Sequence, residues 1–216
     1  ALLSERDIYQ PGPTGARSVD IELRLALLAQ WRVRPQGVGL DPTVDSQGLR
    51  RVDRISQQFQ KLLATQPFPK TGGLHQVASL LAMAYPDRIA KLTRHGRFQL
   101  TSGRGAYLAE QDNLAGAAFL IAAQLDAGRT QARIQLAMAI NEAELRELPD
   151  LPLHQVKSVV WDNAHQAVLS LQEERLGALC LSAKPLADGD ADAVKAAMLQ
   201  GIRQMGLTSL PWDRSS

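Results

Sequence analysis

The sequence has few of the residues that mark extracellular or membrane-spanning proteins. Its 216 residues include one cysteine, Cys180, so no disulfide can form within the chain, which is typical of a reducing cytoplasm. No apolar run approaches the roughly 20 residues that a membrane-spanning helix needs. The first seven residues have neither the basic flank nor the apolar core of a signal peptide. We therefore expect a cytoplasmic protein with no membrane partner.

The chain also lacks the residue patterns that catalytic and metal sites require. A phosphate-binding loop needs Gly-x-x-x-x-Gly-Lys-Ser/Thr, and the nearest glycine-rich piece, at 12–15, has no lysine. The four histidines show neither the i, i+4 spacing nor the Cys-x-x-Cys partner of zinc sites. Cys180 lies in an alternating apolar run that favours an inert buried thiol, and Glu173 and Glu174 would point to opposite sides of a strand. The sequence therefore predicts no catalytic residue, no metal and no cofactor in this chain.

Aromatic residues and net charge are both low, but the charge is unevenly distributed. Aromatics make up 5% of the chain, so aliphatic side chains must build the core of one large or two small domains. The net charge is +2, yet residues 1–109 carry 15 Lys and Arg against 8 Asp and Glu, whereas residues 110–216 carry 9 against 14. This split either steers a polyanion towards one face or reflects two solvated surfaces of different composition.

Helical periodicity fills the first part of the chain and alternation fills most of the rest. Apolar residues in steps of three and four predict helices over 18–31, 49–63 and 74–84, and a short helical turn that follows through Ile89 and Leu92. Alternation then predicts strands, interrupted by a helix that Asn141 and Glu144 open as a capping box. The expected strands are 97–100, 105–108, 119–125, 133–139, 156–161, 167–171 and 176–181. A last helix, capped by Asp188 or Asp190 and closed by Gly206, completes an α+β fold with an antiparallel sheet or small barrel.

A basic stretch without any acidic residue lies where the strands begin. Residues 88–109 contain five cations and no Asp or Glu, and we select all five as candidate nucleic-acid-binding residues: Arg88, Lys91, Arg94, Arg97 and Arg104. The first three are spaced three apart and are predicted to share a helix face, while the last two flank a hairpin turn. Guanidinium groups bind phosphate oxygens well, and local aromatics are scarce, so we expect salt-sensitive and sequence-tolerant binding. The alternative is a solvated basic surface, or one that pairs with acidic groups elsewhere in a larger protein.

Two strings resemble the HrpB family of bacterial ATP-dependent helicases, which are of the DEAH type. They are AYPDRIA at 84–90 and GRFQLTSGRGA at 96–106, and shorter matches follow in order along nearly the whole chain. The shorter strings are LAG at 114–116, LDAG at 125–128, ARI at 132–134, LGAL at 176–179, PL at 185–186, GL at 206–207 and LPW at 210–212. The opening string ALLSERD is similar to an internal segment of the family and has no initiating methionine. We therefore expect a piece cut from a longer protein.

The resemblance implies a particular organisation and role. Residues 1–87 would be a ratchet-like helical region, residues 88–183 an OB-fold-like barrel, and residues 184–216 the start of the HrpB-specific C-terminal region. The parent would be an ATP-dependent helicase that uses ATP and magnesium, but this chain has no Walker motif or DEAH box and is expected to be non-catalytic. Its expected partners are single-stranded RNA or DNA and the motor domains of the same polypeptide. An alternative role is docking onto those motor domains or onto an activating protein, and a third is an independent small enzyme.

Overall fold

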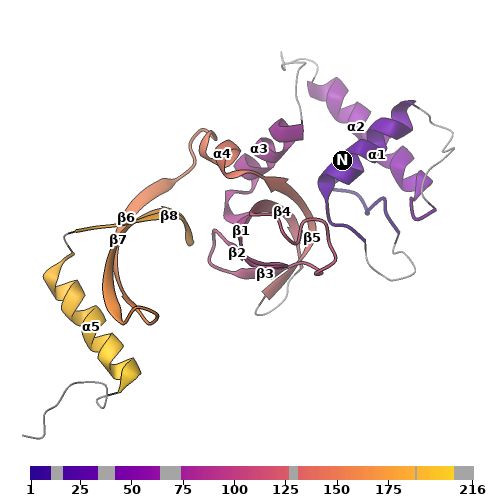
Figure 1. Cartoon of the computed structure of the whole chain (residues 1–216). Coiled ribbons are helices and arrows are strands. Elements are labelled where there is room, and N and C mark those ends of the chain that lie inside the picture. Colours follow the sequence, from indigo (N-terminus) through magenta and orange to yellow (C-terminus); the bar gives the residue numbers. More distant parts are fainter. Residues whose placement is uncertain (11–16, 34–41, 64–73, 127–130, 188, 207–216) are drawn as a thin grey trace, which may run out of the picture. The chain divides into compact units, whose positions relative to one another are not determined.

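The computed structural model describes residues 1–10, 17–33, 42–63, 74–126, 131–187 and 189–206. The chain divides into two compact units, Ala1–Leu151 and Pro152–Ser216. The first unit contains helices and a closed barrel, and the second contains a three-stranded sheet and a helix (Figure 1). This arrangement confirms the predicted α+β class, with a helical portion followed by an OB-fold-like barrel and a C-terminal helix.

Three helices occupy the positions that their apolar periodicity predicts. They are α1 (Ile21–Val33), α2 (Ser46–Leu63) and α3 (Leu74–Ala84). A small core joins α1 and α2 to the N-terminal segment through the buried side chains of Ile8, Leu27, Leu28, Trp31, Leu49 and Val52. At the start of α1, the side chain of Asp20 accepts the Glu22 N–H at 2.8 Å, and the Ser18 hydroxyl oxygen accepts the Asp20 N–H at 3.3 Å.

Five strands of the first unit close into a barrel. They are β1 (Ile89–Arg94), β2 (Arg97–Leu100), β3 (Gly105–Tyr107), β4 (Phe119–Leu125) and β5 (Gln131–Ile140), arranged in the order β1-β2-β3-β5-β4. All neighbours are antiparallel except β3 and β5, which are parallel. Alternate side chains fill the interior, and they are mostly small or aliphatic, among them Ala90, Leu100, Ala106, Leu120 and Ile134. This is a five-stranded barrel of the OB-fold-like kind.

The predicted helical turn through Ile89 and Leu92 is wrong, because both residues belong to a strand. A 3₁₀ turn, η1, covers Pro86–Arg88, and β1 begins at Ile89. Ile89 and Ala90 are fully buried because β1 pairs with β2 on one side and with β4 on the other. Pairing along both edges outweighs the weak local preference that the spacing of three residues indicated.

The short helix after the barrel forms as the capping box predicts. In α4 (Glu142–Arg146), the Asn141 side chain accepts the Glu144 N–H at 2.7 Å, and the Glu144 carboxylate accepts the Asn141 N–H at 3.3 Å. Leu145 is fully buried and anchors this helix in the first unit. Two reciprocal hydrogen bonds and one buried leucine thus stabilise the helix that follows directly after β5.

The second unit is an open sheet with one helix. Its strands β6 (Leu153–Asp162), β7 (Ala167–Leu176) and β8 (Leu179–Pro185) are antiparallel in that order. Within the described residues they pair with one another and with no barrel strand. The barrel therefore ends at β5 and is shorter than the predicted range 88–183, because β5 pairs with β3 and β4 and leaves no free edge for β6.

The last helix, α5 (Ala191–Met205), begins and ends as its sequence predicts. The Asp190 side chain accepts the N–H groups of Asp192 and Ala193, and Gly206 has a φ of 83° at the C-terminal end. A glycine also sets the contact with the sheet, since a Cβ atom at Gly201 would lie 2.1 Å from the Trp161 ring. Among the helices of the described ranges, none combines the length and the apolar character needed to cross a bilayer.

Candidate nucleic-acid interface

Four neighbouring barrel strands, β1, β2, β3 and β5, present an outer face whose residues follow from strand alternation. Ala90, Phe98 and Leu100 point into the barrel and are buried. Their neighbours in the chain, such as Lys91 and Arg97, therefore lie on the outside. The same alternation places every second residue of β3 and β5 on this outer face.

Cross-strand register aligns three arginines and a tyrosine across the outer face. Arg94 lies opposite Arg97, Arg97 opposite Tyr107, and Tyr107 opposite Arg133. We call these four residues the basic row. Arg94 and Arg133 are exposed, and the Arg97 guanidinium lies over the Tyr107 ring, 5.1 Å from its centroid. The row thus offers both cationic groups and an aromatic face on one surface.

A second row runs beside the first and supports it. Register places Lys91 opposite Gln99, Gln99 opposite Gly105, and Gly105 opposite Gln131, and we call these residues the polar row. The two rows are connected, because Nη1 of Arg97 donates to Oε1 of Gln131 at 2.8 Å. Arg97 is therefore held by a hydrogen bond on one side and by the tyrosine ring on the other.

A β-bulge explains how Lys91 and Arg94 come to share this face. Residues three apart in a regular strand point to opposite sides of the sheet. The pairing between β1 and β2 shifts between Leu92 and Arg94, so one extra residue is accommodated there. The bulge brings both cations to the outer face, which a spacing of three residues in β1 would otherwise prevent.

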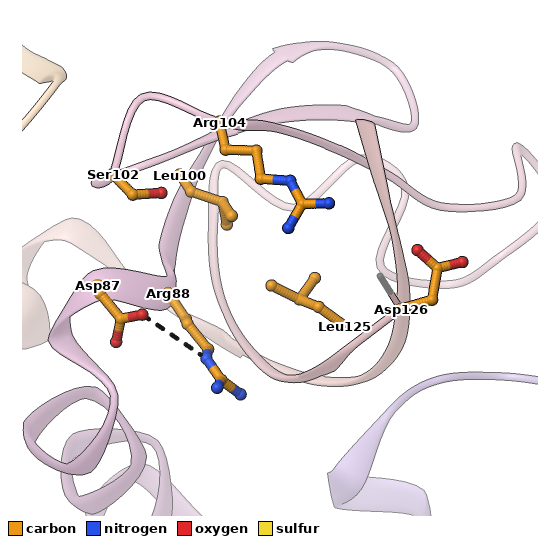
Figure 2. Close-up of a pocket in the computed structure, with 7 residues that line it drawn as sticks. All are labelled: Asp87, Arg88, Leu100, Ser102, Arg104, Leu125 and Asp126. Atoms are coloured by element: carbon orange, nitrogen blue, oxygen red, sulfur yellow. Dashed lines mark ion pairs between the residues drawn. The ribbon is translucent and has the colours of Figure 1, made fainter. Parts of the chain in front are cut away.

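The remaining two predicted cations, Arg88 and Arg104, line a pocket at one end of the barrel. We call it the barrel-end pocket; its volume is about 300 Å³. It is lined by Asp87, Arg88, Leu100, Ser102, Arg104, Leu125 and Asp126. Figure 2 shows Arg104 and Leu125 pointing into the space between the labelled segments, with Arg88 beside Asp87 on one side and the Asp126 carboxylate on the opposite side.

Three contacts hold the Arg88 guanidinium in place. Its Nη1 donates to the Ala123 carbonyl at 3.0 Å, and its Nε lies 3.7 Å from Oδ2 of Asp87. The guanidinium carbon also lies over the Tyr85 ring, 5.0 Å from the centroid.

In the described part of the chain, no three His, Cys, Asp or Glu side chains come together as metal ligands would.

The five predicted residues therefore divide into two sets. Lys91, Arg94 and Arg97 lie on the outer face, whereas Arg88 and Arg104 line the barrel-end pocket. The prediction that Arg88, Lys91 and Arg94 share a helix face is wrong, because Arg88 ends η1 and the other two belong to β1. Being three residues apart does not align side chains in a strand.

Sequence reasoning missed two residues of the basic row. The five candidates include neither Tyr107, an aromatic residue within 88–109, nor Arg133, the first residue of the expected strand 133–139. The signal that links them is the parallel pairing of β3 with β5, which joins residues 26 positions apart in register, Tyr107 and Arg133 among them. A strand pairing of this kind depends on barrel closure and has no local sequence signature.

The chain is similar in sequence and in structure to proteins that are already known. No family model matches the chain. The chain is 36% identical over 160 residues to the ATP-dependent RNA helicase HrpB of Escherichia coli strain K12, a match that covers 73% of this chain and 20% of that protein. A crystal structure of the E. coli DExH-box NTPase HrpB matches 93% of this chain and 25% of its own length, with a TM-score of 0.52 and 30% identity. A second crystal structure, described as the E. coli DEAH/RHA helicase HrpB, matches with a TM-score of 0.51 and 29% identity.

The chain is therefore similar to one segment of proteins described as DExH-box or DEAH/RHA helicases. The particular relative with which it shares homology is HrpB of E. coli. The chain spans about a fifth of the length of the curated relative and a quarter of each crystallised chain.

Proposed function

We propose that this chain is a non-catalytic accessory part of an HrpB-like ATP-dependent RNA helicase that holds single-stranded nucleic acid on the outer face of its barrel. The observation that carries the proposal is the basic row, in which Arg94, Arg97 and Arg133 flank Tyr107 across four adjoining strands. ATP and magnesium would belong to the motor domains of the parent, since this sequence has no phosphate-binding loop. The expected setting is the bacterial cytoplasm.

The dimensions of the row suit a short length of single strand. Neighbouring strands lie about 4.8 Å apart, so a row across four strands spans roughly 14 Å. Single-strand-binding barrels use the same elements, a cationic track along the backbone with aromatic rings on which bases stack. Because every base has an aromatic face and every nucleotide a phosphate, binding by such a row tolerates any sequence.

Removing the cations of the outer face tests the proposal. We expect a Lys91→Ala, Arg94→Ala, Arg97→Ala variant to bind short single-stranded RNA much more weakly at low salt. The plot of log affinity against log salt should also become shallower, by about 0.7 for each phosphate of the single strand that is no longer neutralised. Fluorescence anisotropy of a labelled oligonucleotide over a salt series measures both quantities.

A charge-matched control separates a local effect from a change in net charge. The triple substitution of Arg146, Lys195 and Arg203 by alanine removes the same formal charge from α4 and α5, which contribute no residue to the outer face. That variant should bind as tightly as the unchanged chain. If the two triple variants weaken binding equally, or if the unchanged chain does not bind at low salt, the outer face is not the binding surface.

A docking role is the second candidate, and exposed apolar side chains favour it. Phe59, Leu62 and Leu63 project from the C-terminal half of α2 with 46%, 73% and 50% of their surfaces exposed. Apolar residues grouped in this way mark contact surfaces. We expect the chain to bind the separately purified motor domains of the E. coli relative, and a Phe59→Ser, Leu62→Ser variant to lose that binding in a pull-down. Binding that survives both substitutions would contradict docking through α2.

A further inference from the structure

The barrel-end pocket has a lining that the outer face does not share. Two guanidinium groups and two carboxylates surround it, so its formal charge is close to zero. A bare polyanion gains little from such a lining, because Arg88 lies 3.7 Å from Asp87 and a second carboxylate, that of Asp126, lines the same pocket. A ligand that carries one anionic group together with hydrogen-bond donors would use both kinds of side chain.

A nucleotide unit has this combination of groups. Its phosphate accepts hydrogen bonds from guanidinium groups, and its ribose hydroxyl and base amino groups donate to carboxylates. Leu100 and Leu125 supply an apolar surface for a sugar or a base ring. The volume of about 300 Å³ lies at the lower end of the range for small-molecule sites and admits one such unit.

The pocket is built in advance on one side. Arg88 is held by the Ala123 carbonyl, by Asp87 and by the Tyr85 ring, so its guanidinium is oriented before any ligand arrives. Ordering a long side chain on binding costs free energy, and a side chain that is already ordered avoids that cost. An arginine that is already ordered in this way is better suited to bind a ligand than a freely solvated arginine is.

Two connections link the pocket to the outer face. Arg104 lines the pocket, and the next residue, Gly105, belongs to the polar row. Oδ1 of Asp126 accepts the N–H of Arg133, whose side chain belongs to the basic row, at 2.8 Å. A strand that crosses the outer face towards the turn between β2 and β3 therefore meets the pocket next.

We propose that the barrel-end pocket receives one nucleotide of the strand that lies on the outer face, with its phosphate bound by Arg88 and Arg104. Hydroxyl or amino groups of the same nucleotide donate to Asp126. This inference rests on the proposed function, because the outer face delivers the strand. It adds a site of different chemistry. In the pocket the chain would contact the sugar and base of one nucleotide as well as its phosphate.

The test blocks the pocket without altering any charge. Ser102 is exposed at the turn between β2 and β3 and lines the cavity, so Ser102→Phe fills the pocket while the barrel interior stays unchanged. The matched control is Ser46→Phe, at the exposed start of α2. A second variant, Arg104→Ala, removes one phosphate ligand. All are made in the whole chain and probed with short single-stranded RNA by anisotropy.

A mononucleotide probe reports on the pocket directly. Adenosine 5′-monophosphate should shift the backbone amide resonances of residues 102–105 and 125–126 in the unchanged chain but not in Ser102→Phe. Removal of a charge-assisted hydrogen bond corresponds to about a tenfold weaker affinity or more, so both pocket variants should bind RNA about tenfold more weakly than the control.

The outcomes distinguish the pocket from the outer face. Pocket variants that bind RNA like the unchanged chain, while the outer-face triple variant does not, overturn the pocket inference and leave the proposed function standing. Mononucleotide shifts that Ser102→Phe abolishes without any effect on RNA affinity show a site for free nucleotides, and also overturn the inference. If neither the outer-face nor the pocket variants change RNA binding, both proposals fail.

Discussion

At the scale of single residues, one buried ion pair organises the N-terminal part of the chain. The Arg24 side chain is 2% exposed, and its Nε and Nη2 donate to the two carboxylate oxygens of Asp7 at 3.1 and 2.7 Å. Its Nη1 donates to the Asp20 carbonyl at 2.7 Å, and its guanidinium lies over the Tyr9 ring. A cation buried to this degree is stable because every side of it has a partner.

Replacing Arg24 by methionine should therefore be costly. The change leaves Asp7 without its main partner in a partly buried place, and we expect the free energy of unfolding to fall by about 3 kcal/mol. Arg17→Ala is the control, because Arg17 contacts the same carboxylate at 3.4 Å from a more exposed position and should matter by less than about 1 kcal/mol. Urea denaturation measures both. Equal losses in the two variants would contradict a special role for the buried pair.

Asp7 should also make stability depend on pH in a defined direction. Burial would by itself raise the pKa of Asp7, but hydrogen bonds from Arg24 and the Tyr9 N–H, with the charges of Arg24 and Arg17, hold this pKa below 3.8. A lowered folded-state pKa contributes stability above the unfolded pKa of about 3.9, and that contribution is lost as the pH falls through the folded value. Asp7→Asn should therefore flatten the loss of stability below about pH 4 in denaturation curves taken over an acidic pH series.

Asp20 offers a comparison of opposite sign. Burial raises its pKa above 3.8, the Glu22 N–H lowers it, and the charges of Glu22 and Asp112 raise it further. The free energy of unfolding therefore falls as the pH rises through the raised folded-state pKa of Asp20. Asp20→Asn has no carboxyl group to ionise, so it should not show this fall at the higher-pH end of the same series. If both variants changed the curve in the same direction, the assignment of the two carboxyl groups would be wrong.

At the scale of elements, the contact between α5 and its sheet depends on a residue without a side chain. Gly201 is buried against the Trp161 ring, and a Cβ atom there would approach ring carbons to 2.1, 2.4 and 2.6 Å. A helix that carried any other residue at this position would have to move away from β6. The glycine thus determines how closely α5 approaches the sheet, at a cost in helix propensity.

Gly201→Ala should destabilise the second unit. Alanine favours a helix over glycine by about 1 kcal/mol, but forcing a methyl group into a packed contact costs about 1–3 kcal/mol, so the net change is a loss. Gln200→Ala, at an exposed position of the same helix, gains propensity without a clash. Chemical denaturation of both variants should move them in opposite directions. A Gly201→Ala variant stabilised as much as the control would show that α5 does not pack on Trp161.

At the scale of the whole molecule, the two units differ in how their strands are protected. The barrel strands close on one another, and its interior is filled by fully buried residues such as Ile134 and Leu120. Among the described residues of the second unit, the buried hydrophobic side chains are few: Leu176, Leu179, Leu181 and Ala197. Within the described residues this sheet is also open, so its outer strands, β6 and β8, each have one edge that pairs with no other described strand.

Hydrogen exchange should reveal this difference. Local opening is easier where few apolar side chains are buried and backbone groups face solvent. We expect the backbone amides of β4 and β5 to exchange more slowly than those of β6 and β7 under native conditions, as measured by mass spectrometry or NMR. Equal protection in both units would mean that they unfold together, and the division at Leu151 would not be a boundary of stability.

Local chemistry in the sequence determined much of the fold. The apolar spacing of α1 and α2, the capping box of Asn141 and Glu144, and the Asp190 and Gly206 ends of α5 are all short-range signals, and the structure has each of them. The acid-free run of cations at 88–109 is likewise visible in the sequence, and its role in binding a polyanion stays a prediction. Signals of this kind survive without knowledge of the fold because the interacting groups lie within a few residues of one another.

Tertiary structure alone decided what depends on strand pairing. The segment after Arg88, predicted as helix, forms strand β1, and the barrel ends at Ile140. Arg88 and Arg104 line the barrel-end pocket and are separate from the cations of the outer face. Arg133 also lies beside Tyr107, although the two are far apart in the chain. Each of these outcomes depends on register between distant strands and on a bulge that shifts it, and register is established only when the barrel closes around its core.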